Sequence, residues 1–243
     1  MGTSKSDIDS AGAQVSRVVC ILGMHRSGTS CLAGSLEEAG LHLGDVFRVG
    51  QYNAKGNREN GRIMALQETV LVYSDGSWNR PPKRVTWSDS HRGERDAIIR
   101  SYADVPAWGF KDPRTILLID FWREALPNLM IAGTFRHPLL VAKSLCQRGG
   151  GSVDDWLDLW ADYNERLLAL YEADPFPIVR FDLGGEAYRR SLAFVIDGVG
   201  LQAPARMEFF DPVLRHHEAS PREHVPERVI HLYESLCRIA VSP

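Results

Sequence analysis

The sequence predicts an α/β fold in which helices cover both faces of a central parallel sheet, a three-layer α/β/α arrangement. Short apolar runs, typical of strands buried inside parallel sheets, alternate along the chain with longer stretches of helical periodicity. Polar clusters directly follow three of the apolar runs, at residues 23–30, 111–114 and 136–138. Because ligands of such sheets bind beyond the carboxyl ends of the strands, these clusters predict a site at one edge of the sheet.

The first apolar run, RVVCIL at 17–22, is rich in β-branched residues and predicts a buried strand that ends at Gly23. Apolar residues at helical spacing then predict a helix from about Gly28 to Gly40, so the chain begins as strand, glycine loop and helix. Residues 44–60 are rich in Gly and Asn and predict an irregular loop. The same signals predict further strands at 107–110, 129–135 and 177–181, and further helices at 63–71, 90–104, 115–125, 138–148, 156–170, 186–198 and 226–240.

Composition narrows the class of protein. The chain has 243 residues, of which 44% are hydrophobic and 24% charged, and this fits one domain at 17–243 after a flexible polar tail at 1–16. The net charge of −3 gives no sign of a nucleic-acid partner. The four cysteines form no C-x-x-C pair and are expected to be free thiols in a reducing compartment. With no signal-peptide core and no apolar run of about 18 residues, we expect a cytoplasmic protein without an integral membrane segment.

The segment GMHRSGTS at 23–30 predicts an anion-binding loop. It lies between a buried strand and a helix, where backbone N–H groups and the helix dipole attract negative charge. Its spacing matches the P-loop G-x-x-x-x-G-K-[ST], but Thr29 occupies the position of the lysine that reaches the β and γ phosphates in a kinase. The positive charge lies instead at Arg26. The loop therefore predicts phosphate or sulfate binding, with Ser27, Gly28, Thr29 and Ser30 around the anion.

A second cluster follows the strand at 129–135. Arg136 ends this strand, and Pro138 opens the next helix. Ser144 and Arg148 are four residues apart and share one helix face. Their spacing predicts that Arg136, Ser144 and Arg148 grip a second anion.

These motifs resemble those of sulfotransferases that use 3′-phosphoadenosine 5′-phosphosulfate (PAPS), in particular the bacterial branch that carries R-S-G-T. The segment RSGTS resembles their 5′-phosphosulfate loop, and Arg136 with Ser144 eight residues later resembles their 3′-phosphate segment. The segments GFKDPRT at 109–115, N-x-x-G-x-x-E-N at 53–60 and VRFDL at 179–183 extend the resemblance over residues 17–215.

The resemblance implies a P-loop-like sulfotransferase fold, PAPS as the donor and adenosine 3′,5′-bisphosphate (PAP) as the product. The C-terminal R-K-G loop of many animal members is not visible here, and Arg215 is the candidate for part of that contact. No metal is expected, because the transferred group carries a single negative charge and no His, Cys or Asp cluster has metal-ligand spacing.

Sulfuryl transfer needs cations to stabilise the oxygens and a base to take the acceptor's proton. Arg26 is the first candidate cation and Lys111 the second, although Lys111 can instead form an ion pair with Asp112. Glu59 is the first candidate base, which the resemblance to the R-S-G-T branch also favours. His25, inside the loop, is the next candidate, followed by His137 and Asp112. We expect Trp156 and Trp160 to be core, and the candidates for stacking on adenine are Trp78, Trp87 and Trp108.

Two other functions stay open from the sequence. A P-loop-type small-molecule kinase would need an aspartate for Mg²⁺, and Asp182 is the one fair candidate. A non-catalytic nucleotide-binding module would share the loop without turnover. The acceptor is a hydroxyl or an amine on a small molecule, glycan or lipid, and we expect residues 44–60 and 74–106 to form its pocket. The sequence predicts no oligomeric state.

Overall fold

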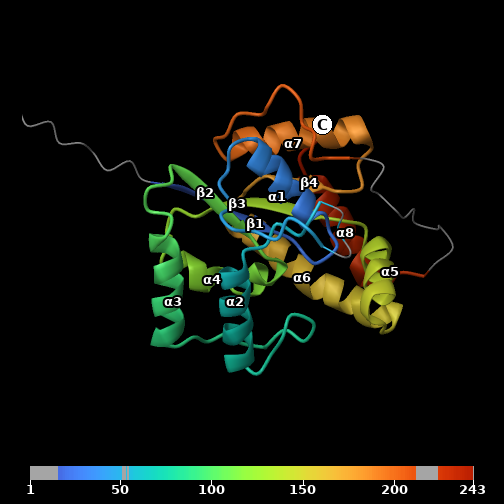
Figure 1. Ribbon diagram of the computed structural model, residues 1–243. Helices are drawn as coiled ribbons and strands as arrows, with labels where there is room; N and C mark the ends of the chain where they lie inside the picture. Colours follow the sequence, from blue (N-terminus) through green and yellow to red (C-terminus); the bar gives the residue numbers. More distant parts are fainter. Residues whose placement is uncertain (1–15, 51–52, 54, 212–223, 243) are drawn as a thin grey trace, which may run out of the picture.

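Four parallel strands form the central sheet, in the order β2-β1-β3-β4 (Figure 1). The computed structural model describes residues 16–50, 53, 55–211 and 224–242, so Arg215 and nearly all of the predicted tail at 1–16 lie outside the described residues. The strands are β1 (Arg17–Leu22), β2 (Ala107–Lys111), β3 (Met130–Phe135) and β4 (Ile178–Arg180), close to the four predicted ones. Because β1 pairs with both β2 and β3, the carboxyl ends of all three strands lie side by side.

The helices form two layers, one on each face of the sheet. Val19 and Ile21 of β1 belong to one buried cluster and Val18, Cys20 and Leu22 to the other, as expected for a strand buried on both faces. On the Val19 face lie α1 (Thr29–Glu38) and α7 (Gly185–Gly198) (Figure 1). The opposite face is covered by α2 (Gly61–Tyr73), α3 (Asp89–Arg100), α4 (Ile119–Arg123), α5 (Pro138–Gly149), α6 (Val153–Ala173) and α8 (Glu227–Ile239). Within the described residues, no helix combines the length and the apolar character needed to cross a membrane.

Several helix starts are fixed by side chains that the sequence places there. The Asn60 side chain accepts hydrogen bonds from two backbone N–H groups of α2, and Ser88 and Ser152 form capping boxes at α3 and α6. Pro138 opens α5, as the sequence predicts. The start of α1 differs, because its N-cap residue is a glycine without a side chain to offer. All four cysteines are free, as expected.

The single helix predicted at 115–125 is wrong. The structure has a 3₁₀ helix, η1 (Pro113–Leu117), then a break at Leu118 with φ of −123°, and then the short α4. The four consecutive residues 116–119 are all buried. A continuous α-helix turns about 100° per residue and would direct at least one of them away from the core. The tighter turn and the break allow all four side chains to enter the core.

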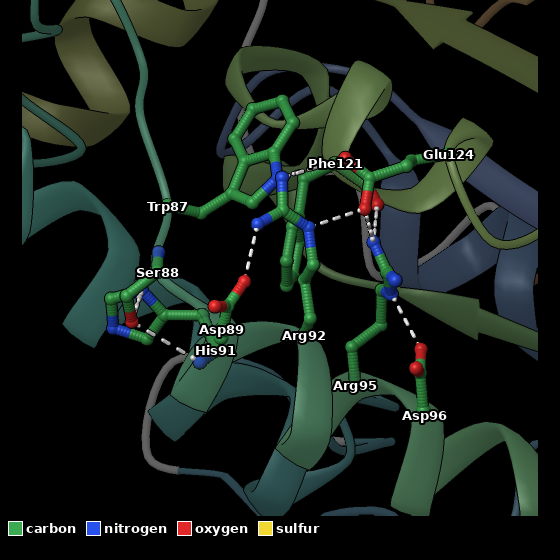
Figure 2. A network of polar contacts seen from close by, with 9 residues as sticks. All are labelled: Trp87, Ser88, Asp89, His91, Arg92, Arg95, Asp96, Phe121 and Glu124. Atoms are coloured by element: carbon green, nitrogen blue, oxygen red, sulfur yellow. Dashed lines mark hydrogen bonds and ion pairs between the residues drawn. The ribbon is translucent and has the colours of Figure 1, made fainter.

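A polar network joins α3 to α4 (Figure 2). The Glu124 carboxylate accepts hydrogen bonds from Arg92 Nε at 2.7 Å, Arg95 at 3.2 Å and Trp87 Nε1 at 3.0 Å. Arg95 is buried, lies over the Phe121 ring and donates to the carbonyl oxygen of Phe121 at 2.7 Å. The hydrogen bond from Arg92, opposed by partial desolvation and aided by Trp87 and Arg95, lowers the pKa of Glu124 to about 2. One carboxylate therefore holds the start of α3 against α4.

Replacing Glu124 with Gln should lower the free energy of unfolding by about 1–3 kcal/mol, because the buried Arg95 guanidinium loses one of its two anionic partners and keeps only the partly exposed Asp96. Asp89→Asn is the matched control, since Asp89 also accepts from Arg92 but is fully solvent-exposed. It should cost less than about 1 kcal/mol. Urea unfolding measures both changes, and equal losses in the two variants would show that the network does not hold the two helices together.

Candidate active site

The loop at residues 23–28 follows β1 at the carboxyl edge of the sheet, between the ends of β2 and β3. Gly28 has φ of 87°, and a Cβ atom at this position would lie 2.3 Å from the Phe181 ring, so a larger residue does not fit. Thr134 of β3 donates from Oγ1 to the carbonyl oxygen of Ser27 at 3.0 Å. These contacts fix the predicted anion loop against the ends of β3 and β4.

The first turn of α1 is suited to an anion. No side chain of the described residues caps this helix, and its first turn contains no acidic residue. Ser27 is fully buried, and within the described part of the chain its Oγ has no hydrogen-bond partner. Backbone N–H groups at a helix start carry partial positive charge and bind phosphate or sulfate readily. Ser27, Gly28, Thr29 and Ser30 therefore form a cradle with donors to spare.

Arg26 and Ser144 meet, although 118 residues separate them in the chain. Arg26 Nε donates to Ser144 Oγ at 2.8 Å, and Arg136 donates to the Arg26 carbonyl oxygen at 3.5 Å. The sequence predicts two anion sites, one around the loop and one around Arg136 and Ser144. The structure places the residues of the two predicted sites in direct contact.

Arg148 adds to the positive charge on this edge. It lies one turn after Ser144 on α5, and the last turn of that helix favours a cation. Burial, and then the nearby Arg148 charge, lower the pKa of Arg26 below its ordinary value. Two cations that repel each other in this way are stabilised when an anion binds between them.

Asp182 holds Arg136 in place at the end of β4. Its Oδ1 lies 3.6 Å from Arg136 Nε, and its Oδ2 accepts from the His137 backbone N–H at 2.6 Å and contacts the Tyr233 hydroxyl at 3.4 Å. Burial raises the pKa of Asp182, opposed by the hydrogen bond from His137 and by the Arg136 charge. The His137 ring packs on Tyr233 at 4.9 Å. Sequence reasoning missed this role of Asp182, although its place at a strand end pointed to the site.

Lys111 and Glu59 form a buried ion pair at the end of β2. The Lys111 ammonium donates to Glu59 Oε1 at 2.6 Å, and both residues are less than a tenth exposed. Desolvation lowers the pKa of Lys111, opposed by the charge of Glu59 and by its hydrogen bond. The alternative pairing of Lys111 with Asp112 is wrong, because the carboxylate of Asp112 binds Arg114 instead. The two predicted catalytic groups are thus in direct contact with each other.

His25 lies between these groups and an aromatic wall. Its ring contacts Trp78 at a centroid distance of 4.4 Å and the edge of Tyr163 at 6.3 Å. Trp78 in turn stacks on Trp156 at 6.0 Å with an interplanar angle of 6°. Burial lowers the pKa of His25 well below its ordinary value, and the charges of Arg114, Lys111, Arg148 and Arg26 lower it further. His25 is therefore neutral at neutral pH.

The other candidate tryptophans lie elsewhere. Trp108 and Trp160 are buried in the core, as expected for Trp160. Trp87 belongs to the network of Figure 2. Trp156 is only partly buried, and its contact with Trp78 places it at the edge of the site rather than in the core. Only Trp78 among the three adenine candidates borders the loop.

Three residues other than glycine have a left-handed backbone in the described part of the chain. They are Arg26 in the anion loop, Arg58 directly before Glu59, and Asp75 after α2, with φ of 66°, 57° and 56°. This conformation costs roughly 1–2 kcal/mol for a residue with a side chain and persists where surrounding contacts enforce it. Arg58, for example, forms an ion pair with Glu37 at 3.0 Å. Strained residues cluster at functional sites, which supports this edge as the site.

In the described ranges, no group of three His, Cys, Asp or Glu side chains could hold a metal ion. The chemistry at this edge is that of cations and N–H donors around a carboxylate and a neutral imidazole. The arrangement is that of an α/β protein with a candidate anion site at the carboxyl edge of a parallel sheet.

Comparison with known proteins agrees with this class. No family model and no curated protein matches the chain. Among solved structures, the crystal structure of the sulfotransferase STF1 from Mycobacterium tuberculosis H37Rv is similar, with a TM-score of 0.55 and 17% sequence identity. The match covers 93% of this chain and 78% of the mycobacterial chain. The likeness confirms the predicted fold class: this chain has a sulfotransferase-like α/β fold.

The low pKa of His25 has a consequence for stability. Below the pKa of an exposed histidine, about 6.5, the unfolded chain takes up a proton that folded His25 does not. This residue therefore destabilises the fold as the pH falls, and His25→Gln removes the effect. The melting temperature of the variant minus that of the wild type should rise from about pH 7.5 to about pH 5.

Thermal unfolding across this pH range measures the difference. His231→Gln is the control, because His231 is exposed on α8 and far from these cations along the chain. A pH-independent difference for His25→Gln would mean that His25 binds its proton equally well in the folded protein and in the unfolded chain.

Proposed function

We propose that the protein is a sulfotransferase that transfers a sulfuryl group from PAPS to a hydroxyl or amine of an acceptor. The observation that carries the proposal is the meeting of Arg26 with Ser144 at 2.8 Å. It joins an R-S-G-T loop to an Arg136–Ser144 pair at one edge of the sheet, as a donor with both a 5′-phosphosulfate and a 3′-phosphate requires. The fold shared with a mycobacterial sulfotransferase supports the same function.

The residues present fit the donor. The first turn of α1 and the buried Ser27 hydroxyl have unused donors among the described residues, which suits the 5′-phosphosulfate. Arg136, Ser144 and Arg148 would hold the 3′-phosphate, with Asp182 orienting Arg136. Arg215, the remaining candidate for the donor, lies outside the described residues. The bound donor supplies the activated sulfuryl group, and the protein supplies position and charge.

The proposed chemistry uses Glu59, Lys111 and Arg26. The bond between sulfur and the bridging phosphate oxygen breaks, a bond from sulfur to the acceptor oxygen or nitrogen forms, and PAP leaves. Arg26 and Lys111 would stabilise the charge on the oxygens. Glu59 would take the acceptor's proton once the Lys111 ammonium turns from Glu59 toward the donor. Neutral His25 is the alternative base.

The kinase alternative has less support. Thr29 occupies the lysine position of the P-loop, and it starts α1 as a largely buried residue. Asp182, the candidate Mg²⁺ ligand, is engaged with Arg136 and the His137 backbone. A non-catalytic nucleotide-binding module would not need the buried Lys111–Glu59 pair, whose desolvation is costly.

Adenosine 3′,5′-bisphosphate should raise the melting temperature without Mg²⁺, by mass action on the native state. The Arg136→Ala substitution should weaken its binding by roughly 2–5 kcal/mol, because a desolvated phosphate loses its cation. Binding of adenosine 5′-phosphosulfate, which lacks the 3′-phosphate, should change far less. Calorimetric titration of both nucleotides gives the selectivity.

Ser144→Ala should show the same selectivity at roughly 1 kcal/mol. A thermal shift seen only with Mg·ATP would refute the sulfotransferase proposal. Equal losses for both nucleotides in Arg136→Ala would instead place the 3′-phosphate elsewhere.

Glu59→Gln keeps the shape of the side chain and removes the proton acceptor. The turnover number should fall by roughly 10²–10⁴, the usual contribution of a general base, while the affinity for PAP stays within a factor of about 3. The loss should shrink at high pH for an acceptor that ionises unaided. Arg26→Ala is the comparison, because it should lower both PAP binding and turnover. A Glu59→Gln enzyme that keeps more than about a tenth of the turnover would assign the base to His25.

A further inference from the structure

The segment between α2 and α3, residues 74–88, borders the candidate site at one end and carries exposed cations at the other. It contains Arg80, Lys83 and Arg84 but only one acid, Asp75, so its formal charge is +3 − 1 = +2, in a chain whose net charge is −3. We call Arg80, Lys83 and Arg84 the basic loop. All three side chains are exposed, and the described residues provide no ion pair to any of them.

The segment is held in a fixed shape. Ser74 Oγ donates to the Thr86 carbonyl oxygen at 3.1 Å and accepts from the Thr86 N–H at 3.0 Å, which closes its base. Ser77 and Arg80 exchange backbone hydrogen bonds at 3.0 and 3.3 Å. Pro82 is buried against Gly76, where a Cβ atom would lie 2.6 Å from the Pro82 ring. In Figure 1 the segment leaves the end of α2, loops out on the side of α2 away from α3 and then crosses to the start of α3.

The tip of the segment forms one wall of the site. The Tyr163 hydroxyl on α6 donates to the Trp78 carbonyl oxygen at 2.7 Å. Burial raises the pKa of Tyr163, so this donor stays protonated. The Trp78 ring packs on His25 and stacks on Trp156, whose Nε1 donates to the Gly150 carbonyl oxygen at 2.8 Å. Trp78 is therefore fixed beside His25 and Arg26, two residues before the first cation of the basic loop.

The left-handed backbone of Asp75 ends α2 and fixes the start of this segment. The Gly76 and Asp75 N–H groups donate to the carbonyl oxygens of Leu71 and Val72 at 2.9 and 3.0 Å, which is the Schellman pattern of a helix C-terminus. A fixed loop loses little conformational entropy when it binds a ligand.

We propose that the acceptor is an anionic, ring-bearing small molecule whose ring packs against the Trp78 wall and whose carboxylate, phosphate or sulfate is recognised by the basic loop. This inference rests on the proposed function for the reaction itself. Tryptophan faces suit sugar and aromatic rings, and exposed guanidinium and ammonium groups suit an acid at the mouth of a site. In the proposed function, the anionic groups of the donor are bound by Arg26, Arg136, Ser144 and Arg148. The basic loop is therefore available for the acceptor.

Two probes that differ only in the acid group test the proposal. They are 4-nitrophenyl β-D-glucuronide and 4-nitrophenyl β-D-glucoside, titrated calorimetrically into the protein loaded with PAP. The glucuronide should bind about tenfold more tightly, and added salt should reduce the preference. A triple variant in which Gln replaces Arg80, Lys83 and Arg84 should bind both probes with an affinity ratio of about one, and its affinity for the glucoside should equal that of the wild type.

The control variant replaces three exposed arginines away from the site, Arg100, Arg190 and Arg206, and should keep the preference. Equal binding of both probes, no glucuronide binding at millimolar concentration, or a preference that survives in the basic-loop variant would each overturn the proposal. If the wild type sediments with phosphatidylserine vesicles and shows no preference for the glucuronide, the proposal is overturned and a lipid surface is the partner of the basic loop.

The experiment distinguishes failure of the proposed function from failure of this inference. If PAP alone does not bind to the protein, the sulfotransferase proposal fails, whatever the result with the glucuronide. The same pair of probes titrated into the nucleotide-free protein then still reports whether the basic loop selects an acid.

Discussion

The parallel pairing of β1 with both β2 and β3 is the constraint on which the site depends. Parallel strands present their carboxyl ends at one edge, and with β1 in the middle the three following loops must converge there. This is why Arg26, Lys111 and Arg136, which are far apart in the chain, share one neighbourhood. The burial of β1 on both faces fixes the position of the edge, because any shift of β1 along its neighbours would expose residues such as Ile21 and Leu22.

Positive charge gathers at this edge. The side chains of Arg26, Lys111, Arg136 and Arg148 contribute to it, and Glu59 and Asp182 form ion pairs with Lys111 and Arg136. Desolvation lowers the pKa of Arg26 and Lys111, so both cations are held at a cost. An anionic ligand would relieve this cost, and part of its affinity would come from that relief. The same positive charges keep His25 neutral. An anion bound beside them would therefore raise the pKa of His25.

The sequence was sufficient for most of the fold because its signals are local. Apolar runs such as 17–22 and helical spacing such as 156–170 depend on neighbouring residues alone, and all of the predicted strands have counterparts in the structure. The helix predicted at 115–125 was wrong because burial of 116–119 on all sides is a tertiary demand. Likewise, the pairing of Lys111 with Glu59 spans 52 residues and that of His25 with Trp78 depends on a loop, so neither appears in a local pattern.

The network around Glu124 has a consequence for how this architecture could diversify. Within the segment at 74–88, Trp87 donates to Glu124, Ser88 caps α3 and the Trp78 ring packs on His25, so the stretch between them is fixed at both ends. The exposed side chains of Arg80, Lys83 and Arg84 lie between these contacts, and their replacement would leave the sheet and the anion loop undisturbed. Under the proposed function, the edge of the sheet would be the constant frame, and these exposed positions would be the exchangeable part through which the fold could acquire new acceptors.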